Sequence, residues 1–375
     1  MDLVEELKVR QAALERVAIA KDLDAVVVVG NSAIGPRSYG SFRYFSGHRC
    51  YYYMYAVVIR PGKKPTVCLV SILDKEGILR KGFEDIRFNA DVRSIILEVL
   101  AEQPVKRVGV CFEELPVRWE NGILEQFPGV ELVDVEEDIA EIRKVHSEYE
   151  LDCFKQCAKI TDIGYEAVCK AAKPGVKMSD LHAVLDHALS YAGAEDILTK
   201  MSCGVFSEKD NGLTRMLRFH WPDERVVKEG DNIAMSISAQ YRGYWTQQVR
   251  TICVGKDNEK AKAAYDTQKE AIKDAAAFLR PGIKLGELVE HMWKFAESHG
   301  YKKALPFGHI VGLDLDEGGA GAGSDFEIIE NTVVVLHPAL IPEGEENCFF
   351  WGDTYLVTKD GAVRLNESSE ELLTV

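Results

Sequence analysis

Apolar residues in the first part of the chain follow two different periods. Residues 3–22 carry leucine, valine and isoleucine at helical spacing, which predicts an amphipathic helix. The run AVVVVG at 25–30 is continuously apolar and is followed by Asn31, which is typical of a buried strand. The segment YYYMYAVVIRPGKKPTVCLV then predicts two strands on either side of the turn PGKK at 61–64.

Strands and helices continue to alternate up to about residue 138. RVGVCF at 107–112 and GVELVDV at 129–135 are apolar runs of strand length. Helical periodicity lies near 92–102 and near 116–126. Alternating strands and helices favour a layered α/β domain. We therefore expect residues 1–138 to form an α/β N-terminal domain.

The chain beyond residue 139 begins with a long helical pattern. Residues 142–172 predict a single helix with one apolar face, made of Leu151, Phe154, Ala158, Ile163 and Tyr165.

An internal repeat follows this helical pattern. AAKPGVKMSDLHAVLDHALSYAG ends at 193 and FLRPGIKLGELVEHMWKFAESHG ends at 300, so Pro174 corresponds to Pro281. Each copy is followed by a strand phrase, EGDNIAMSISA in the first case and ENTVVVLHPAL in the second. The repeat predicts that residues 139–375 form an α+β domain with pseudo-two-fold symmetry and a cleft between its halves.

Composition narrows the classes of function. A chain of 375 residues is long for a single core, which agrees with two domains. The net charge of −15 argues against nucleic acid and anionic membrane surfaces as partners. No apolar stretch approaches the length of a membrane span. The nine cysteines include no CxxC pair, which favours reduced thiols and a cytoplasmic location.

Three motifs resemble one enzyme superfamily. EGDNIAMSISAQYRGYWTQQVRTICVG at 229–255 resembles the signature strand pair of the pita-bread superfamily, which contains methionine aminopeptidases, Xaa-Pro peptidases and creatinases. GHIVGL resembles the GHGIGL motif of that family, and RYFSGH at 43–48 resembles the N-terminal domain of Xaa-Pro peptidases and creatinase. The resemblance implies a pita-bread catalytic domain at 139–375. It also implies a homodimer in which each N-terminal domain covers the partner's active site.

The family's metal-ligand positions are changed in this chain. In the metallopeptidases two aspartates, one histidine and two glutamates hold a pair of metal ions. The resemblance places Ser236, Gln247, His309, His337 and Gly352 at those five positions. Hard divalent ions prefer anionic oxygen ligands, so we expect that the dinuclear site is lost and that no metal cofactor is bound. The alternative is a single softer ion on the two histidines, assisted by Asp353 or Asp316.

A further histidine is the leading candidate for proton transfer. His220, in RFHWP, resembles a superfamily histidine that contacts substrate and that handles the proton in metal-free creatinase. Its side chain titrates near neutral pH, so we predict that it is the general acid or base. The structural alternative is a packed histidine between Phe219 and Trp221.

His309 and His337 are the other predicted catalytic residues, and both would polarise or position the scissile group. The alternatives are a turn histidine bonded to the backbone at 309 and a buried core histidine at 337. Predicted substrate contacts are Ser236, Gln247, Arg49, Arg218, Trp245 and Asp353. Each arginine has the alternative of being a solvated surface charge.

These residues favour a substrate that carries a carboxylate. The carboxylates with which creatinase holds a guanidinium would fall at Val249 and Gly352, where none is present. A neutral to basic site matches an anionic ligand.

We therefore expect a metal-independent hydrolase that cleaves a non-peptide C–N bond in a small carboxylate-bearing molecule. Three other hypotheses remain: a lyase acting on a similar substrate, a catalytically silent binding module, and an Xaa-Pro peptidase. The missing carboxylates disfavour the last.

Overall fold

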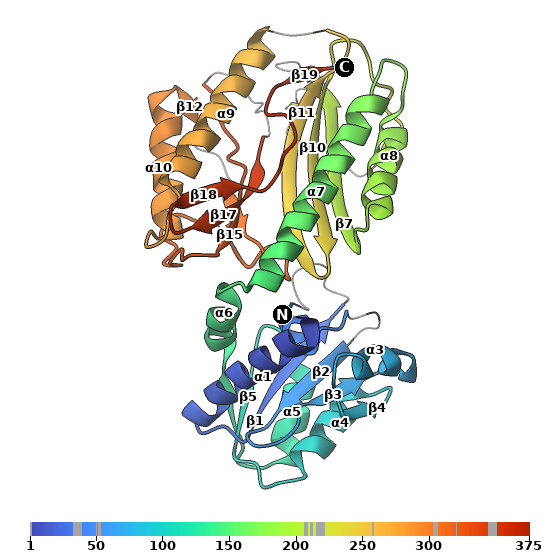
Figure 1. The fold of residues 1–375 in the computed structure, drawn as a ribbon, viewed down its shortest axis with the longest axis vertical. Helices are drawn as coiled ribbons and strands as arrows, with labels where there is room; N and C mark the ends of the chain where they lie inside the picture. The colour runs from blue at the N-terminus through green and yellow to red at the C-terminus, as the bar shows by residue number, and fades with distance from the viewer. Residues whose placement is uncertain are drawn as a thin grey trace. The chain divides into compact units, whose positions relative to one another are not determined.

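The structure is a computed structural model that describes residues 2–32, 40–49, 51, 54–205, 209–210, 213–214, 222–256, 259–302, 307–319, 321–343 and 351–375. The chain forms two compact units, Met1–Tyr149 and Glu150–Val375 (Figure 1). The sequence placed the domain boundary at residue 138, whereas the division falls within the first turn of α7 (Glu148–Ala171). The physical reason is that α6 (Glu136–Lys144) packs against α1 (Leu3–Ala20) and so belongs to the first unit.

The first unit is built on a mixed sheet. In its described part the sheet has six strands in the order β4-β3-β2-β1-β5-β6. Their bounds are β1 Ala25–Asn31, β2 Met54–Ile59, β3 Thr66–Leu69, β4 Asp85–Phe88, β5 Arg107–Val110 and β6 Glu131–Asp134. The central strand β1 pairs antiparallel with β2 and parallel with β5, which is typical of a layered α/β domain.

Helices cover this sheet. Ala25, Val27 and Val29 of β1 pack in one apolar cluster with α4 (Val92–Leu100) and α5 (Val117–Gln126), while α1 contacts β1 and β2. The carboxylate of Asp2 accepts a hydrogen bond of 3.0 Å from the backbone N–H of Glu5 and so caps α1. The α/β architecture is confirmed. The sequence pattern does not predict four elements of this unit: α2 (Gly40–Ser46), η1 (Ile72–Asp74), α3 (Lys75–Leu79) and β4.

The prediction of one helix over 142–172 is wrong. Helix α6 ends at Lys144, Val145 is extended with φ −98° and ψ 104°, and α7 begins at Glu148. Ile163 was also assigned to the apolar face of this helix, but it is 48% exposed. It lies nine positions after Phe154, which turns it about half a turn away from that buried side chain.

The second unit contains the predicted repeat, now visible as two helix pairs. Helices α7 and α8 (Met178–Tyr191) form one pair, and α9 (Glu259–Phe278) and α10 (Leu285–Ser298) form the other (Figure 1). Each turn contains a glycine with positive φ, 94° at Gly175 and 87° at Gly282. Each of these glycines donates a 2.8 Å backbone hydrogen bond, to Val227 and Ile328 respectively. The equivalent contacts confirm the pseudo-two-fold organisation.

Two sheets carry the rest of this unit. One has the order β19-β11-β10-β7 and the other has the order β14-β13-β15-β17-β18. The bounds are β7 Asp196–Gly204, β10 Asn232–Tyr241, β11 Tyr244–Cys253, β13 Gly308–Ile310, β14 Gly318–Gly319, β15 Val333–Leu336, β17 Asp353–Thr358, β18 Gly361–Arg364 and β19 Leu373–Thr374. The short pairs β8 (Lys209–Asp210) with β9 (Leu213–Thr214) and β12 (Tyr301–Lys302) with β16 (Ile341–Pro342) lie outside these sheets.

The two sheets are joined by a bridge between β11 and the start of β17. Val249, on β11, and Gly352, just before β17, exchange two backbone hydrogen bonds of 2.9 and 3.0 Å. This bridge brings β10 and β11, which carry the motif of 229–255, beside β13, β15 and β17.

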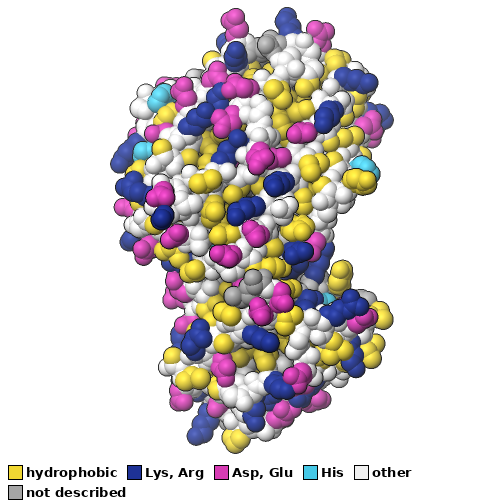
Figure 2. All heavy atoms as spheres, in the orientation of Figure 1, with side chains coloured by type: hydrophobic (Ala, Val, Ile, Leu, Met, Phe, Trp, Pro, Cys, Tyr) yellow, Lys and Arg dark blue, Asp and Glu magenta, His cyan; other side chains and the backbone are white. Residues whose placement is uncertain are grey.

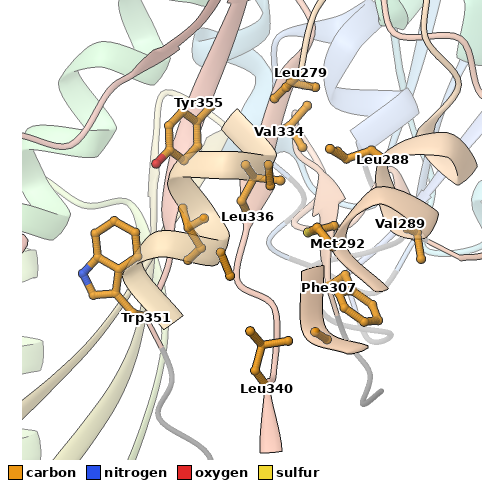
Figure 3. Packing of buried hydrophobic residues seen from close by; sticks show 14 of the residues in the cluster. Leu279, Leu288, Val289, Met292, Phe307, Val334, Leu336, Leu340, Trp351 and Tyr355 are labelled. Carbon is orange, nitrogen blue, oxygen red and sulfur yellow. The ribbon is translucent and has the colours of Figure 1, made fainter. Parts of the chain in front are cut away.

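Each sheet buries one face against its helices. Figure 3 shows Val334, Leu336 and Tyr355 of the second sheet packed with Leu288 and Met292 of α10. In the first sheet Ile233, Met235 and Ile237 pack with residues of α7 and α8. Since successive strand residues point to opposite faces, the alternate residues of both sheets are left for the site.

The distribution of charged side chains and the state of the cysteines can be compared with what the composition predicts. Acidic and basic side chains are interspersed over the face seen in Figure 2. The seven cysteines in the described ranges are all free thiols. Within the same ranges no helix has the length and apolar character needed to cross a membrane.

Candidate functional site

A chain of three polar side chains links the two sheets. The amide of Gln247 on β11 contacts Ser236 on β10, with 2.8 Å between Nε2 and Oγ. Its other end contacts His309 on β13, with 2.8 Å between Oε1 and the ring Nε2. Ser236 and His309 are 8% and 9% exposed, so these bonds lie in a largely dehydrated environment. The structure thus brings three of the predicted site residues into direct contact.

The backbone of Gln247 is held by a residue that the sequence analysis missed. The hydroxyl of Thr354 on β17 accepts a 3.1 Å hydrogen bond from the Gln247 N–H and donates a 2.9 Å bond to the Gln247 carbonyl. Thr354 lies opposite Val335 in the register, and Val335 lies opposite His309, so these residues share one face. The run DTYLVT does not alternate between polar and apolar residues, so no periodicity in the sequence marks Thr354 as a site residue.

The contacts of His309 match two proton states. Its Nε2 faces Gln247 Oε1, and its Nδ1 lies 3.3 Å from the Ile310 carbonyl, so in this orientation of the amide both ring nitrogens face oxygen acceptors. An imidazolium satisfies both contacts because each nitrogen carries a proton.

A neutral imidazole satisfies the same contacts when the Gln247 amide is turned over. The amide N–H then donates to Nε2, Ser236 donates to the amide oxygen, and Nδ1–H donates to Ile310. The network can therefore take up a proton at His309 by rotating one amide group.

His337 lies directly after β15 and is 4% exposed. Its ring centroid is 5.2 Å from that of His309, with the ring planes inclined at 59°. Burial, reinforced by the neighbouring His309, lowers the pKa of His337 to about 3. His337 is consequently neutral at physiological pH, and its imidazole can offer hydrogen bonds but no positive charge.

Glycines bring the backbones close around these histidines. Gly308 has φ 153°, and a Cβ at that position would lie 2.1 Å from the Val335 carbonyl oxygen. A Cβ at Gly352 would lie 2.4 Å from the Leu336 carbonyl oxygen and 2.6 Å from the Cβ of His337. The bridge at Gly352 therefore leaves no space for a side chain at the fifth of the family's ligand positions.

The assignment of Asp353 to the substrate site needs correction. Its carboxylate binds Arg250 at 2.7 Å and Arg364 at 2.5 Å, and the side chains of both Asp353 and Arg250 are 0% exposed. Arg250 also donates to the backbone carbonyls of Val249 and Gly352. Asp353 is therefore part of a buried ion-pair cluster that supports the junction of the two sheets, and it is not free to contact a substrate.

Trp245 lies on the same face of β11 as Gln247, because the two are two positions apart. It is 1% exposed, and its backbone N–H donates to Gly312 at 2.8 Å. Its buried indole N–H has no hydrogen-bond acceptor among the described residues. Such a donor is available to a ligand that reaches this face.

Three predicted site residues remain, and of these only Arg49 lies within the described residues. Arg49 belongs to the first unit, where its guanidinium lies 5.7 Å from the ring centroid of Tyr51. His220 and Arg218 lie outside the described residues.

No metal-binding arrangement was found in the described part of the chain: no three His, Cys, Asp or Glu side chains converge there on a common point.

Comparisons with known proteins agree with the fold and with the sequence motifs. The model of metallopeptidase family M24 matches residues 152–359, and the model of the creatinase/prolidase N-terminal domain matches residues 10–145. An Xaa-Pro dipeptidase of Pyrococcus horikoshii is 28% identical over 250 residues, which are 65% of this chain and 68% of that protein. A creatinase of a Bacillus species is 24% identical over 367 residues, which are 91% of this chain and 85% of that protein.

Solved structures share the whole fold. An X-Pro aminopeptidase from Thermotoga maritima superposes with a TM-score of 0.85 at 18% identity, covering 97% of this chain and 99% of that one. The prolidase from Pyrococcus horikoshii has a TM-score of 0.83 at 23% identity, again covering 97% and 99%. These likenesses confirm the fold, and the two family-model matches confirm the resemblance to the pita-bread superfamily. Because the family model matches more than half of its residues, the chain belongs to metallopeptidase family M24 and carries a creatinase/prolidase N-terminal domain before the catalytic one.

Proposed function

We propose that this protein is a hydrolase that works without the dinuclear metal centre of its family and cleaves a non-peptide C–N bond in a small carboxylate-bearing molecule. The contact that carries the proposal is the direct hydrogen bonding of Ser236, Gln247 and His309. These three residues stand where the family resemblance places metal ligands, and they are side chains without a carboxylate that satisfy one another's hydrogen bonds.

The residues present do not fit a pair of divalent cations. Ser236, Gln247 and two histidines offer neutral donors, whereas hard divalent ions require carboxylates to balance their charge. The fifth ligand position is Gly352, where even a Cβ would collide with β15. No step of the reaction is therefore assigned to a metal.

Hydrolysis requires one proton to be removed and one to be supplied. A base takes a proton from water, the water oxygen attacks the carbon of the C–N bond, and an acid protonates the departing nitrogen. We assign the transfer to His220, on the basis of its motif. His309 can hold an added proton when the Gln247 amide turns its Oε1 toward the ring Nε2, and neutral His337 positions the scissile group by hydrogen bonding.

The charge of the site supports the substrate class. The carboxylate of Asp353, which the sequence assigned to the substrate site, is already neutralised by two arginines. Ser236 and Gln247 are neutral, so a cationic guanidinium would find no counter-charge among them. An anionic group matches the donors better, and Arg218 together with Arg49 of a partner subunit would supply positive charge in the proposed homodimer.

The first test is the metal content and the effect of chelation. We expect purified protein to hold less than about one equivalent of Mn, Co, Zn or Fe per chain, and we expect its activity to survive EDTA. Activity is measured on small N-substituted carboxylates, namely ureido and amidino acids including creatine, and in parallel on Xaa-Pro dipeptides.

The relatives named as Xaa-Pro dipeptidases define the competing outcome. Two tightly bound ions per chain, together with metal-dependent release of proline from an Xaa-Pro dipeptide, would overturn the proposal.

A further inference from the structure

We propose that Lys200 binds the carboxylate of the substrate, an inference that rests on the proposed function and specifies how the substrate is recognised. Lys200 lies on β7, directly opposite Ser236 of β10 in the antiparallel register. Side chains at opposed positions of an antiparallel pair lie on the same face. Lys200 therefore shares the face that carries Ser236 and Gln247.

The neighbours of Lys200 along β7 give the same orientation independently. Met201 and Cys203 belong to the apolar cluster of α7 and α8, and the Thr199 hydroxyl donates to Asp186 of α8 at 2.7 Å. Odd-numbered residues of this strand thus face the helices. The even-numbered Lys200 must point to the other side, where the polar chain from Ser236 to His309 lies.

Among the described residues, none supplies a counter-charge to Lys200. Its side chain is half-buried and makes no ion pair or hydrogen bond with any residue of the described ranges. By contrast, exposed lysines such as Lys177 and Lys284 pair with Glu224 and Asp325. A partly dehydrated ammonium without an anion is unfavourable, and a ligand carboxylate would supply that anion.

The adjacent positions on the same face do not supply a carboxylate either. Leu198 and Ser202 flank Lys200 along β7, and their partners on β10 are Ser238 and Ala234. The four-carbon stem of a lysine lets its ammonium swing over the row that contains Ser236. The geometry points to a small ligand whose carboxylate meets Lys200 while its reacting bond lies near His309.

A purely structural role is the competing explanation. Strand β7 is at the edge of its sheet, and edge lysines can discourage pairing with other chains. That role predicts self-association of a Lys200 variant and leaves ligand binding unchanged. The two roles therefore differ in what a substitution does.

The test measures the binding of simple carboxylates to EDTA-treated full-length protein by ligand-observed NMR. The probes are acetate, glycolate and succinate, compared with acetamide, glycolamide and succinamide. We expect the carboxylates to bind more tightly than the amides. Lys200→Met should weaken carboxylate binding about tenfold or more, and Lys200→Arg should retain most of it. Lys170→Met, at an exposed position of α7, is the matched control and should behave as wild type.

Three outcomes would overturn the inference: Lys200→Met binding the carboxylates as wild type does, self-association of that variant as its only change, or no carboxylate preference in wild type. Lys200→Gln serves as a second variant if Lys200→Met does not fold. The metal analysis and the chelator experiment test the proposed function separately. If Lys200→Met binds carboxylates as wild type does and the enzyme resists chelation, this inference is wrong but the proposed function still stands.

Discussion

At the residue scale, His309 and His337 differ because their surroundings differ. His309 reaches a polar amide and a backbone carbonyl, so a proton on its ring finds acceptors. His337 is fully enclosed, and burial together with the adjacent His309 lowers its pKa to about 3. Two histidines with rings 5.2 Å apart can therefore divide the work between proton binding and positioning.

Replacing His337 should change how stability depends on pH. The folded-state pKa of about 3 lies below the ordinary value of 6.5, so the unfolded chain binds more protons between these limits. The contribution of neutral His337 to the free energy of unfolding is fully present above about pH 6.5 and is lost as the pH falls toward 3. Urea unfolding of His337→Gln from pH 3.5 to 7.5 should show a flatter decline than wild type. The exposed His299→Gln variant is the control. An identical decline in His337→Gln and wild type would contradict this account.

Replacing His220 tests the proposed proton transfer. General acid–base assistance is worth roughly a hundred- to ten-thousand-fold in rate, so His220→Ala should lose activity on that scale. His220→Gln should keep substrate binding better than turnover because its amide still forms hydrogen bonds. The histidine limb of the pH–rate profile should vanish in both variants. Turnover by His220→Ala within a few fold of wild type would transfer the role to His309.

At the element scale, the junction of β11 with the start of β17 controls the site. Two neighbouring residues shape this junction in different ways. Gly352 has no side chain and so lets the two backbones approach, whereas the carboxylate of Asp353 forms ion pairs with Arg250 and Arg364. Thr354, the next residue, reaches back across the junction to the backbone of Gln247. The position of Gln247 therefore depends on pairing between elements far apart in the sequence.

Filling the space at Gly352 should destabilise this junction. The added methyl group of Gly352→Ala would meet the Leu336 carbonyl and the His337 side chain, and overpacking of this kind costs about 1–3 kcal/mol. Gly321→Ala is the control, because a Cβ there meets no atom within 4 Å. Chemical denaturation of both variants measures the difference. Equal free energies of unfolding would show that the backbone at Gly352 adapts.

Neutralising Asp353 should affect stability more than substrate affinity. Asp353→Asn leaves the buried Arg250 without its anion, whereas Arg364 keeps Glu370 at 3.4 Å, and breaking a buried pair in this way costs about 3–5 kcal/mol. Asp325→Asn, which breaks an exposed pair with Lys284, should change stability little. KM of the folded Asp353→Asn variant should stay near wild type. A large rise in KM with normal stability would restore Asp353 to the substrate site.

At the scale of the whole molecule, the chain combines a mixed-sheet unit with a repeated unit whose two halves share the helix-pair turn. Both halves place a glycine of positive φ after the first helix, and in both it donates a hydrogen bond to the residue two positions before the strand phrase. The polar chain joins the two halves, since Ser236 and Gln247 come from one and His309 from the other. Replacing a member of this chain in either half therefore changes the same hydrogen-bond network.

Subunit mixing tests the proposed dimer. If each N-terminal unit completes the partner's site, Arg49→Ala and His220→Ala chains should each be inactive alone. Mixed heterodimers should regain part of the activity, because one of their two sites has both residues intact. The heterodimers are isolated with two affinity tags, and a mixture of identically tagged wild-type chains sets the reference rate. No recovery in verified heterodimers would show that Arg49 does not act across the interface.

Much of the fold follows from patterns that are local in sequence. Apolar runs of strand length and of helical period predict most of the strands and helices of the first unit. The repeated segment, in which Pro174 corresponds to Pro281, predicts the two halves of the second unit. The motif resemblance also selected Ser236, Gln247 and His309 before their contacts were known. The break at Val145 and the exposure of Ile163 escaped prediction, because each depends on how a helix docks and not on its composition.

The sequence by itself determined the family, the duplicated architecture and the absence of carboxylates from the expected ligand positions, because these are properties of residue identity and spacing. Only the tertiary structure decided that Asp353 turns toward Arg250, that His337 is too buried to be charged at neutral pH, and that Lys200 shares a face with Ser236. The physical reason is that register, burial and ion pairing join residues far apart in the chain. A strand displaced by one residue would reverse the direction of every side chain on it.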